Sequence, residues 1–450
     1  MASGDGGSCL GAATSRVEWI DQAVDAAVRL SRLAPGRQAV VGVVLPWELP
    51  DDPSTLLIGA ADRSFLSGPD GWQLAEGTAD QAVSDGPDRF AQLSRHRAAR
   101  QQLTVVAAPR GGAEHIRWLL AATFSEQSPK PGEWGEALPA TRLWLPRRLR
   151  LRTAGSGWDI RALVVGSEDD PGQAAVRLMM EPTPSAKQPA NPWSALPDTY
   201  AVRVEDAVEL IRDLAMKKVV LARAVDEPIA ATDRVVVERL RAGAGTMYWL
   251  DLDHGGAFAG RTPELLMECA GDQVRTMALA GTCAASDDPA ELLASTKQRK
   301  EHGLVVEHLV AALRPRCRPF AVPGQPGLRR IGSLIHLETL VESTVLHRDW
   351  LDLVAALHPT PAVCGLPAAT AAHWLRRREG LERGLYAGVL GWISATACRL
   401  VVPLRGAVLA ADRSRARLYA GAGIVETSDP AAELAETELK LGAMRAVLGR

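Results

Sequence analysis

The end of the chain places two carboxylates and an ammonium group where they could bind a metal ion and an anionic ligand. The segment from Tyr419 to Lys440 reads YAGAGIVETSDPAAELAETELK, so a glycine-rich strand end comes directly before an expected helix. Glu433, Glu436 and Lys440 share one face of that helix, because spacings of three and four residues return to the same side. The alternative is a solvated surface helix with an internal Glu–Lys pair, worth only about 0.2–0.5 kcal/mol. The spacing alone leaves both interpretations open.

A second acidic segment could complete a metal site. The stretch from Lys297 to Val310, KQRKEHGLVVEHLV, carries Glu301 one turn before an apolar stripe. Glu301 and the carboxylates of the last helix would together supply oxygen ligands for a hard cation such as Mg²⁺. The last helix has a well-marked start, since Asp429 can cap it and Pro430 suits the first helical position. Spacing does not show that the two helices meet.

Composition and charge argue against several classes of protein. The chain has 450 residues and a formal net charge of −2, so nothing requires a nucleic acid or an anionic membrane as partner. We interpret the single basic run, Arg147 to Arg152, as a strand with a solvated face. The cysteines form no CxxC pair, and no signal peptide or membrane-spanning run is visible. We therefore expect reduced thiols in a cytoplasmic protein.

Two regions of different character are expected. Residues 1–190 mix short apolar runs with polar segments, as in strands joined by loops, and residues 181–200 are proline-rich and form the best linker candidate. In residues 191–450 strand and helix patterns alternate irregularly, which predicts an α+β fold with antiparallel sheets and helices outside. The expected strands are 39–45, 103–108, 218–222, 246–252, 274–280, 387–394, 400–404 and 417–420. The expected helices are 204–214, 290–313, 350–357, 367–378 and 430–448.

Six motifs follow one another along residues 200–450. They are KVVLAR at 218–223, GRTPELL at 260–266, LAGT at 279–282, Glu301 with His302, LHPTPAVCG at 357–365, and the closing segment 421–440. In this order they resemble the motifs of the chorismate-utilising enzymes, and most closely those of isochorismate synthases. Residues 1–190 fit the variable N-terminal part of that family only loosely.

The resemblance implies a fold, a reaction and a cofactor. We expect the chorismate-binding fold of the anthranilate synthase component I type, with antiparallel sheets forming a sandwich core and helices packed outside. Residues 1–190 would contribute a variable part of this fold and residues 191–450 the catalytic region. The implied substrate is chorismate; in isochorismate synthases water adds at C2 of its ring while the hydroxyl leaves C4. The implied cofactor is Mg²⁺, bound to the ring carboxylate.

This substitution needs a base on one side of the ring and an acid on the other. The base position of the family matches Lys218 and the acid position matches Glu264. Alternation along the strand sends Lys217 to the opposite face, which favours Lys218. Both roles require protonation states set by burial or neighbouring charges. Without the other motifs, Lys218 would be interpreted as an exposed lysine at a strand end and Glu264 as an acid at a helix start.

The resemblance also assigns residues to the metal and to the substrate. Glu436 and Glu301 match direct ligands of the metal, and Glu433 is expected to support metal-bound water. Arg405 matches an arginine that faces a substrate carboxylate, for which a bidentate guanidinium is well suited, and Lys440 faces a carboxylate as well. The other substrate-binding candidates are Gly281, Thr282, His336, Ala362, Tyr386 and Gly421.

Some of these assignments have competing interpretations. His336 and Tyr386 could instead be core residues with one satisfied polar tip. We interpret Arg383, in the motif RGLYAG, as structural. Gln298 stands where relatives often place an acid that supports the metal, so its neutrality could weaken Mg²⁺ binding.

Further positions discriminate within the family. Amine-transferring members generally lack a lysine at the position of Lys218, and aminodeoxychorismate synthases typically carry a nucleophilic lysine where this chain has Ala280. Members that eliminate pyruvate tend to have threonine at the position of Ala362. Thr262 replaces a usual serine and Cys364 a usual small residue, but neither change removes a group in contact with the substrate.

Three hypotheses remain. The leading one is a Mg²⁺-dependent isochorismate synthase, an isomerase that feeds menaquinone, siderophore or another isochorismate-derived product. The alternatives are a salicylate synthase, which would follow the same step by eliminating pyruvate, and a non-catalytic chorismate-binding module. We expect a monomer without a glutamine amidotransferase partner. The sequence does not identify the pathway.

Overall fold

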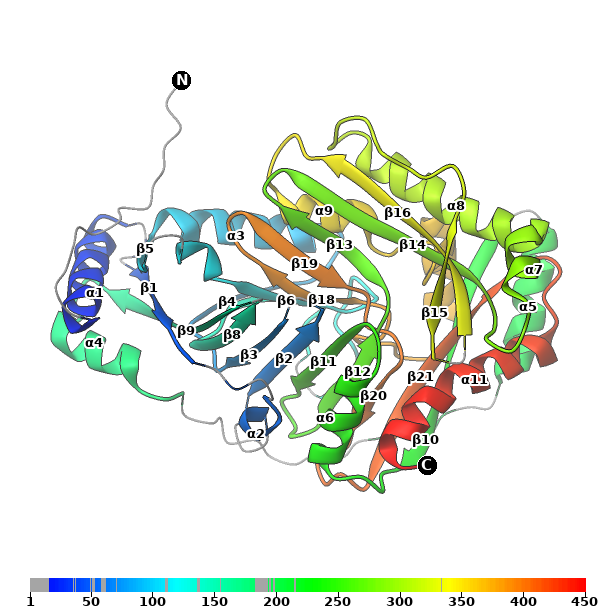
Figure 1. Cartoon of the computed structure of the whole chain (residues 1–450), viewed down its shortest axis with the longest axis horizontal. Coiled ribbons are helices and arrows are strands. Elements are labelled where there is room, and N and C mark those ends of the chain that lie inside the picture. Colours follow the sequence, from blue (N-terminus) through cyan, green and yellow to red (C-terminus); the bar gives the residue numbers. More distant parts are fainter. Residues whose placement is uncertain are drawn as a thin grey trace.

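The computed structural model is organised around two large β-sheets whose facing sides enclose the main core (Figure 1). It describes residues 16–450 except 35, 37, 49, 51–52, 58–61, 70, 110–111, 136–137, 154, 183–192, 194–195, 197–198, 214–215 and 333. Buried side chains from strands of both sheets belong to one hydrophobic cluster. The predicted α+β sandwich with antiparallel sheets and outer helices is therefore confirmed.

Among the described residues the larger sheet has 12 strands. Their order is β17 (Gly365–Leu366), β10 (Lys218–Pro228), β21 (Arg415–Ile424), β20 (Gly406–Leu409), β12 (Ala257–Thr262), β11 (Thr246–Asp251), β2 (Arg63–Gly68), β3 (Gly71–Glu76), β8 (Arg148–Thr153), β9 (Ser156–Gly166), β1 (Gln38–Pro46) and β5 (Thr104–Ala107). Neighbouring strands are antiparallel, apart from the parallel pair β1 and β5.

The second sheet has 9 strands in the described part of the chain. Their order is β15 (Gly327–Ile331), β16 (Leu334–Thr344), β14 (Gln273–Ala284), β13 (Leu265–Ala270), β19 (Ala397–Val401), β18 (Val389–Ile393), β6 (Trp118–Ala122), β7 (Thr141–Leu145) and β4 (Asp80–Ser84). Strands from both sides of residue 190 take part in each sheet, since β2 pairs with β11 and β6 pairs with β18.

Helices cover the outer faces of the sheets. They are α1 (Arg16–Leu33), α2 (Ser54–Leu57), α3 (Arg89–Gln102), α4 (Pro171–Met179), α5 (Tyr200–Arg212), α6 (Asp233–Ala242), α7 (Pro289–Ala294), α8 (Thr296–Leu313), α9 (Trp350–Leu357), α10 (Ala368–Arg378) and α11 (Pro430–Leu448), with a 3₁₀ turn at Ala113–His115. Helix α8 lies along β14 and β16, and α11 lies along β21 (Figure 1). None of the helices in the described part of the chain is both long and apolar enough to cross a membrane.

Most predicted elements occur near the expected positions, with two clear differences. The predicted helices 350–357 and 430–448 are confirmed as α9 and α11, and Asp429 does cap α11 by accepting from the N–H of Ala432. The predicted single helix 290–313 is wrong, because Ser295 adopts an extended conformation and caps a new helix through the N–H of Gln298. The strand predicted at 400–404 lies earlier, at Ala397–Val401. Most of the linker candidate 181–200 lies outside the described residues.

The basic run also differs from its prediction. It does form a strand, β8, but its arginine face is not solvated. Arg148 is buried and binds Asp159, with 2.8 Å between Nε and Oδ1. Asp159 also accepts from Nε of Arg161 at 3.1 Å, and Arg150 pairs with Glu76 at 2.8 Å. Burial is tolerated because each of these arginines faces a carboxylate.

This network predicts a large effect of one substitution on stability. Asp159→Ala would remove the buried one of the two carboxylates that Arg148 and Arg161 share, and leave them only the more exposed Glu181, so we expect the free energy of unfolding to fall by about 3 kcal/mol. The matched control is Asp272→Ala, which removes an exposed pair with Arg348 and should change stability much less than Asp159→Ala. Urea unfolding followed by circular dichroism measures both. Equal effects of the two variants would contradict the prediction.

Candidate active site

A cavity with an empty volume of about 680 Å³ collects nearly all of the predicted site residues. It lies where the ends of β10, β14, β16 and β21 meet α8 and α11. The predicted residues that line it are Lys218, Glu264, Gly281, Thr282, Glu301, His336, Ala362, Tyr386, Arg405, Gly421, Glu436 and Lys440. Of the predicted set, Glu433 alone does not line it.

Lys218 is the first residue of β10 and points into this cavity. Its side chain is 3% exposed, whereas its neighbour Lys217 is exposed, as the alternation of the strand predicted. The Nζ atom of Lys218 donates to Oε1 of Glu301 on α8 at 2.7 Å. Gly423 on β21 leaves room for this pair, since a Cβ there would lie 2.8 Å from Cε of Lys218 and 3.0 Å from Oε1 of Glu301.

Glu264 lies in the connection between β12 and β13, and not at a helix start. Its N–H donates to Oγ1 of Thr262 at 3.1 Å, and that hydroxyl donates in turn to the carbonyl of Val402. The threonine that replaces the usual serine thus still holds the turn. Burial raises the pKa of Glu264 to about 7, although the charges of Arg405 and the two lysines oppose the shift. The carboxyl therefore holds a proton over part of the neutral pH range.

Helix α11 presents a second ammonium–carboxylate pair to the cavity. Nζ of Lys440 lies 2.6 Å from Oε1 of Glu436 and donates to the carbonyl of Gly421 at 2.8 Å. Burial works to raise the pKa of Glu436, but the positive charges of Lys440, Arg405 and Lys218 outweigh it and hold the pKa below its usual value. Glu436 is therefore an anion in this site.

Arg405 brings a cation into the cavity in an unusual backbone conformation. Its φ of 48° lies in the left-handed region, which non-glycine residues rarely adopt and which is costly unless the surroundings enforce it. Within the described part of the chain its guanidinium makes no hydrogen bond or ion pair. Burial lowers its pKa, while Tyr386, Glu264 and Glu436 oppose this shift. A buried guanidinium without a carboxylate is suited to bind one from a ligand.

His336 and Tyr386 are both buried and both line the cavity. Nδ1 of His336 lies 2.8 Å from Oγ1 of Thr282, and its Nε2 has no hydrogen-bond partner. Burial, followed by the charges of Arg405 and Lys440, lowers the pKa of His336 to about 3, so the ring is neutral. Tyr386 stacks on Tyr419 with 5.3 Å between ring centroids, and burial raises its pKa to about 12. His336 and Tyr386 are thus buried core residues that also face the cavity, so the core role and the substrate-binding role do not exclude each other.

Several residues that line the cavity were not predicted. They are Val220, Pro263, Leu279, Ala280, Val363, Ala387, Leu404 and Gly423. Most are apolar or contribute backbone, so their side chains carry no chemical signal. Arg383 also reaches the cavity, but it donates to the carbonyls of Val363 and Val220 and to the carboxylate of Glu379. These partners agree with the structural role favoured by the sequence.

The predicted metal ligands are only partly brought together. The described residues contain no group of three or more His, Cys, Asp or Glu side chains placed to hold a metal ion. Glu301 and Glu436 line the cavity, whereas Glu433 accepts a hydrogen bond from Ser428 at 2.6 Å. The buried hydroxyl of Tyr200 has no partner, and its pKa is raised first by burial and then by Glu433 and Glu436. Glu301 and Glu436 line the same cavity, and two carboxylates fit a hydrated Mg²⁺, which usually takes one or two carboxylates together with water and substrate.

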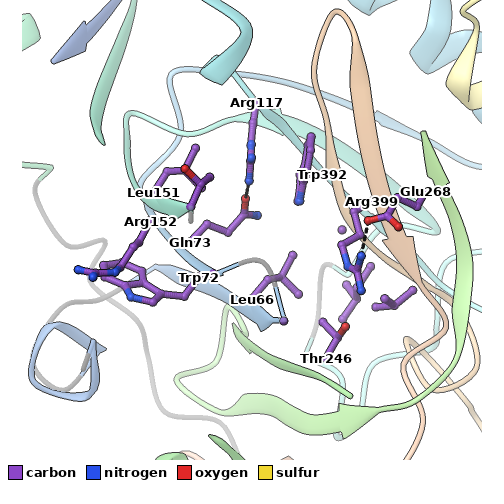
Figure 2. Close-up of a pocket in the computed structure, with 16 residues that line it drawn as sticks. Leu66, Trp72, Gln73, Arg117, Leu151, Arg152, Thr246, Glu268, Trp392 and Arg399 are labelled. Atoms are coloured by element: carbon purple, nitrogen blue, oxygen red, sulfur yellow. Dashed lines mark hydrogen bonds and ion pairs between the residues drawn. The ribbon is translucent and has the colours of Figure 1, made fainter. Parts of the chain in front are cut away.

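A second cavity lies between the two sheets and shares no lining residue with the first (Figure 2). In it Arg117 stacks on Trp392, with 3.6 Å from Cζ to the ring centroid, and donates to Oε1 of Gln73 at 2.7 Å. Burial lowers the pKa of Arg117 to about 9. None of the predicted site residues lines this cavity.

Comparison with known proteins agrees with this geometry. The family model of the chorismate binding enzymes matches residues 53–449, and the chain therefore belongs to this family. It is 39% identical over 277 residues to the protein MenF of Mycobacterium tuberculosis (strain ATCC 25618 / H37Rv), a match that covers 56% of this chain and 74% of that protein. It is also 39% identical over 260 residues to the salicylate biosynthesis isochorismate synthase of Pseudomonas aeruginosa, covering 55% and 54%. With the isochorismate synthase DhbC of Bacillus subtilis it shares 34% over 273 residues, covering 56% and 68%.

Two solved structures share the fold. The menaquinone-specific isochorismate synthase MenF of Escherichia coli superposes with a TM-score of 0.73 at 24% identity, covering 96% of this chain and 100% of that one. Anthranilate synthase component I of Streptococcus pneumoniae gives a TM-score of 0.60 at 19% identity, covering 88% and 94%. The comparisons confirm both the predicted resemblance to isochorismate synthases and the predicted enzyme class, an isomerase.

The buried carboxyl of Glu264 predicts a pH dependence of stability. Its pKa of about 7 in the folded protein exceeds the ordinary value of 4.5, so the folded state binds the proton more tightly. Stability from this group is present below pH 4.5 and is lost as the pH rises toward 7, by on the order of 3 kcal/mol. Glu264→Gln should lack this loss. Urea unfolding of both proteins at pH 5 and pH 8 measures the difference, and parallel pH curves would contradict the prediction.

Proposed function

We propose that this chain is an isochorismate synthase, which converts chorismate to isochorismate by adding water at C2 of the ring and removing the hydroxyl at C4. The observation that carries the proposal is that Lys218 and Glu264, the expected base and acid, line one buried cavity together with the unpaired guanidinium of Arg405. Relatives named as isochorismate synthases support the same reaction.

The two titratable groups account for the proton movements of the reaction. The ammonium of Lys218 that pairs with Glu301 must first lose a proton to solvent, because an ammonium cannot accept one; as the free amine Lys218 then takes a proton from the attacking water as the water oxygen bonds to C2. Glu264 gives a proton to the C4 oxygen as that bond breaks, so one water enters and one water leaves. A pKa of about 7 suits an acid that must hold and release its proton near neutral pH.

Cationic and neutral donors of the cavity suit an anionic substrate. Arg405 is free to bind a carboxylate in bidentate fashion, and Lys440 adds a second positive charge. His336 is neutral and has an unpaired Nε2, and the hydroxyl of Tyr386 lies 3.3 Å from where a Cβ on Gly421 would stand. Gly421 therefore leaves space beside that hydroxyl for a ligand.

Mg²⁺ is part of the proposal. Glu301 and Glu436 would hold the ion. Glu433, one turn before Glu436 on α11, would accept a hydrogen bond from water bound to the ion. When bound, the ion would neutralise and orient the ring carboxylate of chorismate. Gln298 has a buried side-chain oxygen without a hydrogen-bond partner, so it offers an uncharged acceptor where relatives often place an acid.

The runner-up is a salicylate synthase that goes on to eliminate pyruvate. Ala362 lines the cavity where pyruvate-eliminating members tend to have threonine, which favours stopping at isochorismate. A non-catalytic chorismate-binding module is the third hypothesis, and the presence of both acid and base in the cavity speaks against it. A cytoplasmic monomer without a glutamine amidotransferase, acting in menaquinone or siderophore biosynthesis, completes the proposal.

The test incubates the purified protein with chorismate and Mg²⁺ and follows the products by NMR. We expect isochorismate without pyruvate; salicylate with pyruvate would support the runner-up, and unchanged chorismate would overturn the proposal. Lys218→Ala should lower the rate at least about 100-fold, because a general base is lost. Lys217→Ala is the matched control and should retain the rate, since that side chain is exposed.

Metal binding can be tested apart from turnover. Isothermal titration of the free protein with Mg²⁺ should show at least about tenfold weaker binding for Glu301→Gln and Glu436→Gln, because each loses a charged oxygen ligand. Glu433→Gln should weaken binding less, since Glu433 binds Ser428 and does not line the cavity. Unchanged affinity in the first two variants would show that the ion binds elsewhere.

A further inference from the structure

The wall of the cavity contains an irregularity between β14 and β16. Leu279 pairs with Glu338 and Thr282 pairs with His336, so Ala280 and Gly281 together stand opposite Leu337. This two-against-one arrangement is a β-bulge, which bends its strand and re-aims the neighbouring side chains. Gly281 has a φ of 84°, which favours glycine. Ala280, Gly281 and Thr282 all line the cavity as a result.

His302 connects this bulge to the rest of the site. It lies on α8 and is 3% exposed. Its Nδ1 lies 3.1 Å from the carbonyl oxygen of Ala280, and its Nε2 lies 2.7 Å from Oγ1 of Thr339 on β16. The ring therefore spans the bulged strand and its partner. On the same helix the preceding residue, Glu301, binds Lys218.

The partners of the ring define its tautomer. A carbonyl only accepts, so Nδ1 must carry the hydrogen and donate to Ala280. Nε2 is then an acceptor and receives the hydroxyl hydrogen of Thr339. Both ring nitrogens are thus used by the protein, and neither is free for the substrate.

We propose that His302 is a positioning residue, which anchors the Ala280–Gly281 bulge to α8 and so holds the substrate-facing wall of the cavity. The anchor acts on binding because the bulge aims Thr282, whose hydroxyl holds His336 at 2.8 Å. It also links this wall to the helix that carries Glu301. The inference rests on the proposed function only in naming chorismate as the ligand.

Two substitutions separate the two contacts of the ring. In His302→Asn the amide nitrogen takes roughly the place of Nδ1 and can still donate to Ala280. In His302→Gln the amide reaches roughly the place of Nε2, so the contact with Thr339 remains and that with Ala280 is lost. We expect the glutamine variant to raise KM for chorismate about 10- to 100-fold with little change in kcat. A displaced cavity wall would weaken binding of the substrate and of the transition state equally. The asparagine variant should stay within about threefold of the wild type.

A second readout is independent of turnover. Hydrogen exchange of the free protein, measured by mass spectrometry, should rise in a peptide covering residues 279–283 for His302→Gln and stay unchanged for His302→Asn. Thr339→Val, which removes only the hydroxyl that contacts Nε2 of His302, should raise KM less than His302→Gln. If the glutamine variant does not fold, the effect of Thr339→Val on KM and on exchange tests the anchor in its place. Equal behaviour of the glutamine and asparagine variants, or a loss confined to kcat, would overturn the inference. If the wild type does not turn over chorismate, the proposed function is wrong. The exchange result still shows whether His302 anchors the bulge.

Discussion

The ion pair between Lys218 and Glu301 is the interaction on which the site depends. It joins the first residue of β10, in the larger sheet, to α8, which lies on the smaller sheet. A buried ammonium is costly unless a carboxylate meets it at close range. The pair therefore requires the end of β10 and helix α8 to keep their distance. Gly423 leaves the space that the pair occupies, because a Cβ there would push Cε of Lys218 and Oε1 of Glu301 aside. The packing of α8 near the end of β10 and the proposed chemistry of Lys218 thus require the same distance between these two elements.

Charge balance in the cavity follows from that pair and from a second one. Lys218 is matched by Glu301 and Lys440 by Glu436, whereas Arg405 has no carboxylate among the described residues and Glu264 is protonated over part of the neutral range. The cavity thus carries an excess of positive charge in a site largely shielded from water, where unpaired charge is expensive. An anionic ligand relieves this cost. Such a site binds a carboxylate more strongly than exposed cations would.

The sequence predicts the parts of the site that depend on local spacing. The face of α11 with Glu436 and Lys440 follows from helical periodicity, and the choice of Lys218 over Lys217 follows from alternation along β10. The assignment of Glu264 came from its motif alone, because nothing in the spacing shows how deeply a residue in a strand connection is buried. The break at Ser295 was missed because a serine inside a helical pattern does not reveal that it will act as a cap.

Long-range pairing explains the other differences. The bulge at Ala280 and Gly281 depends on the register between two strands about 60 residues apart, which LAGT alone does not encode. The burial of Arg148 on β8 likewise depends on Asp159 of the next strand, so the alternating pattern of that run does not show which face water reaches.

The interleaved sheets also limit how far the two predicted regions can be treated separately. Strand β2 joins the strands of residues 191–450 by pairing with β11, and β6 does the same by pairing with β18. Without residues 1–190 both β11 and β18 would become edge strands with unpaired N–H and C=O groups, and the enclosed core would lose the side chains that β1, β3, β6, β7, β8 and β9 contribute to it. Residues 1–190 thus complete the sandwich that holds β12 and β13 in place. Glu264 lies in the connection between these two strands. Its burial there raises its pKa. The raised pKa of the proposed acid therefore depends on the packing of the two sheets that hold this connection.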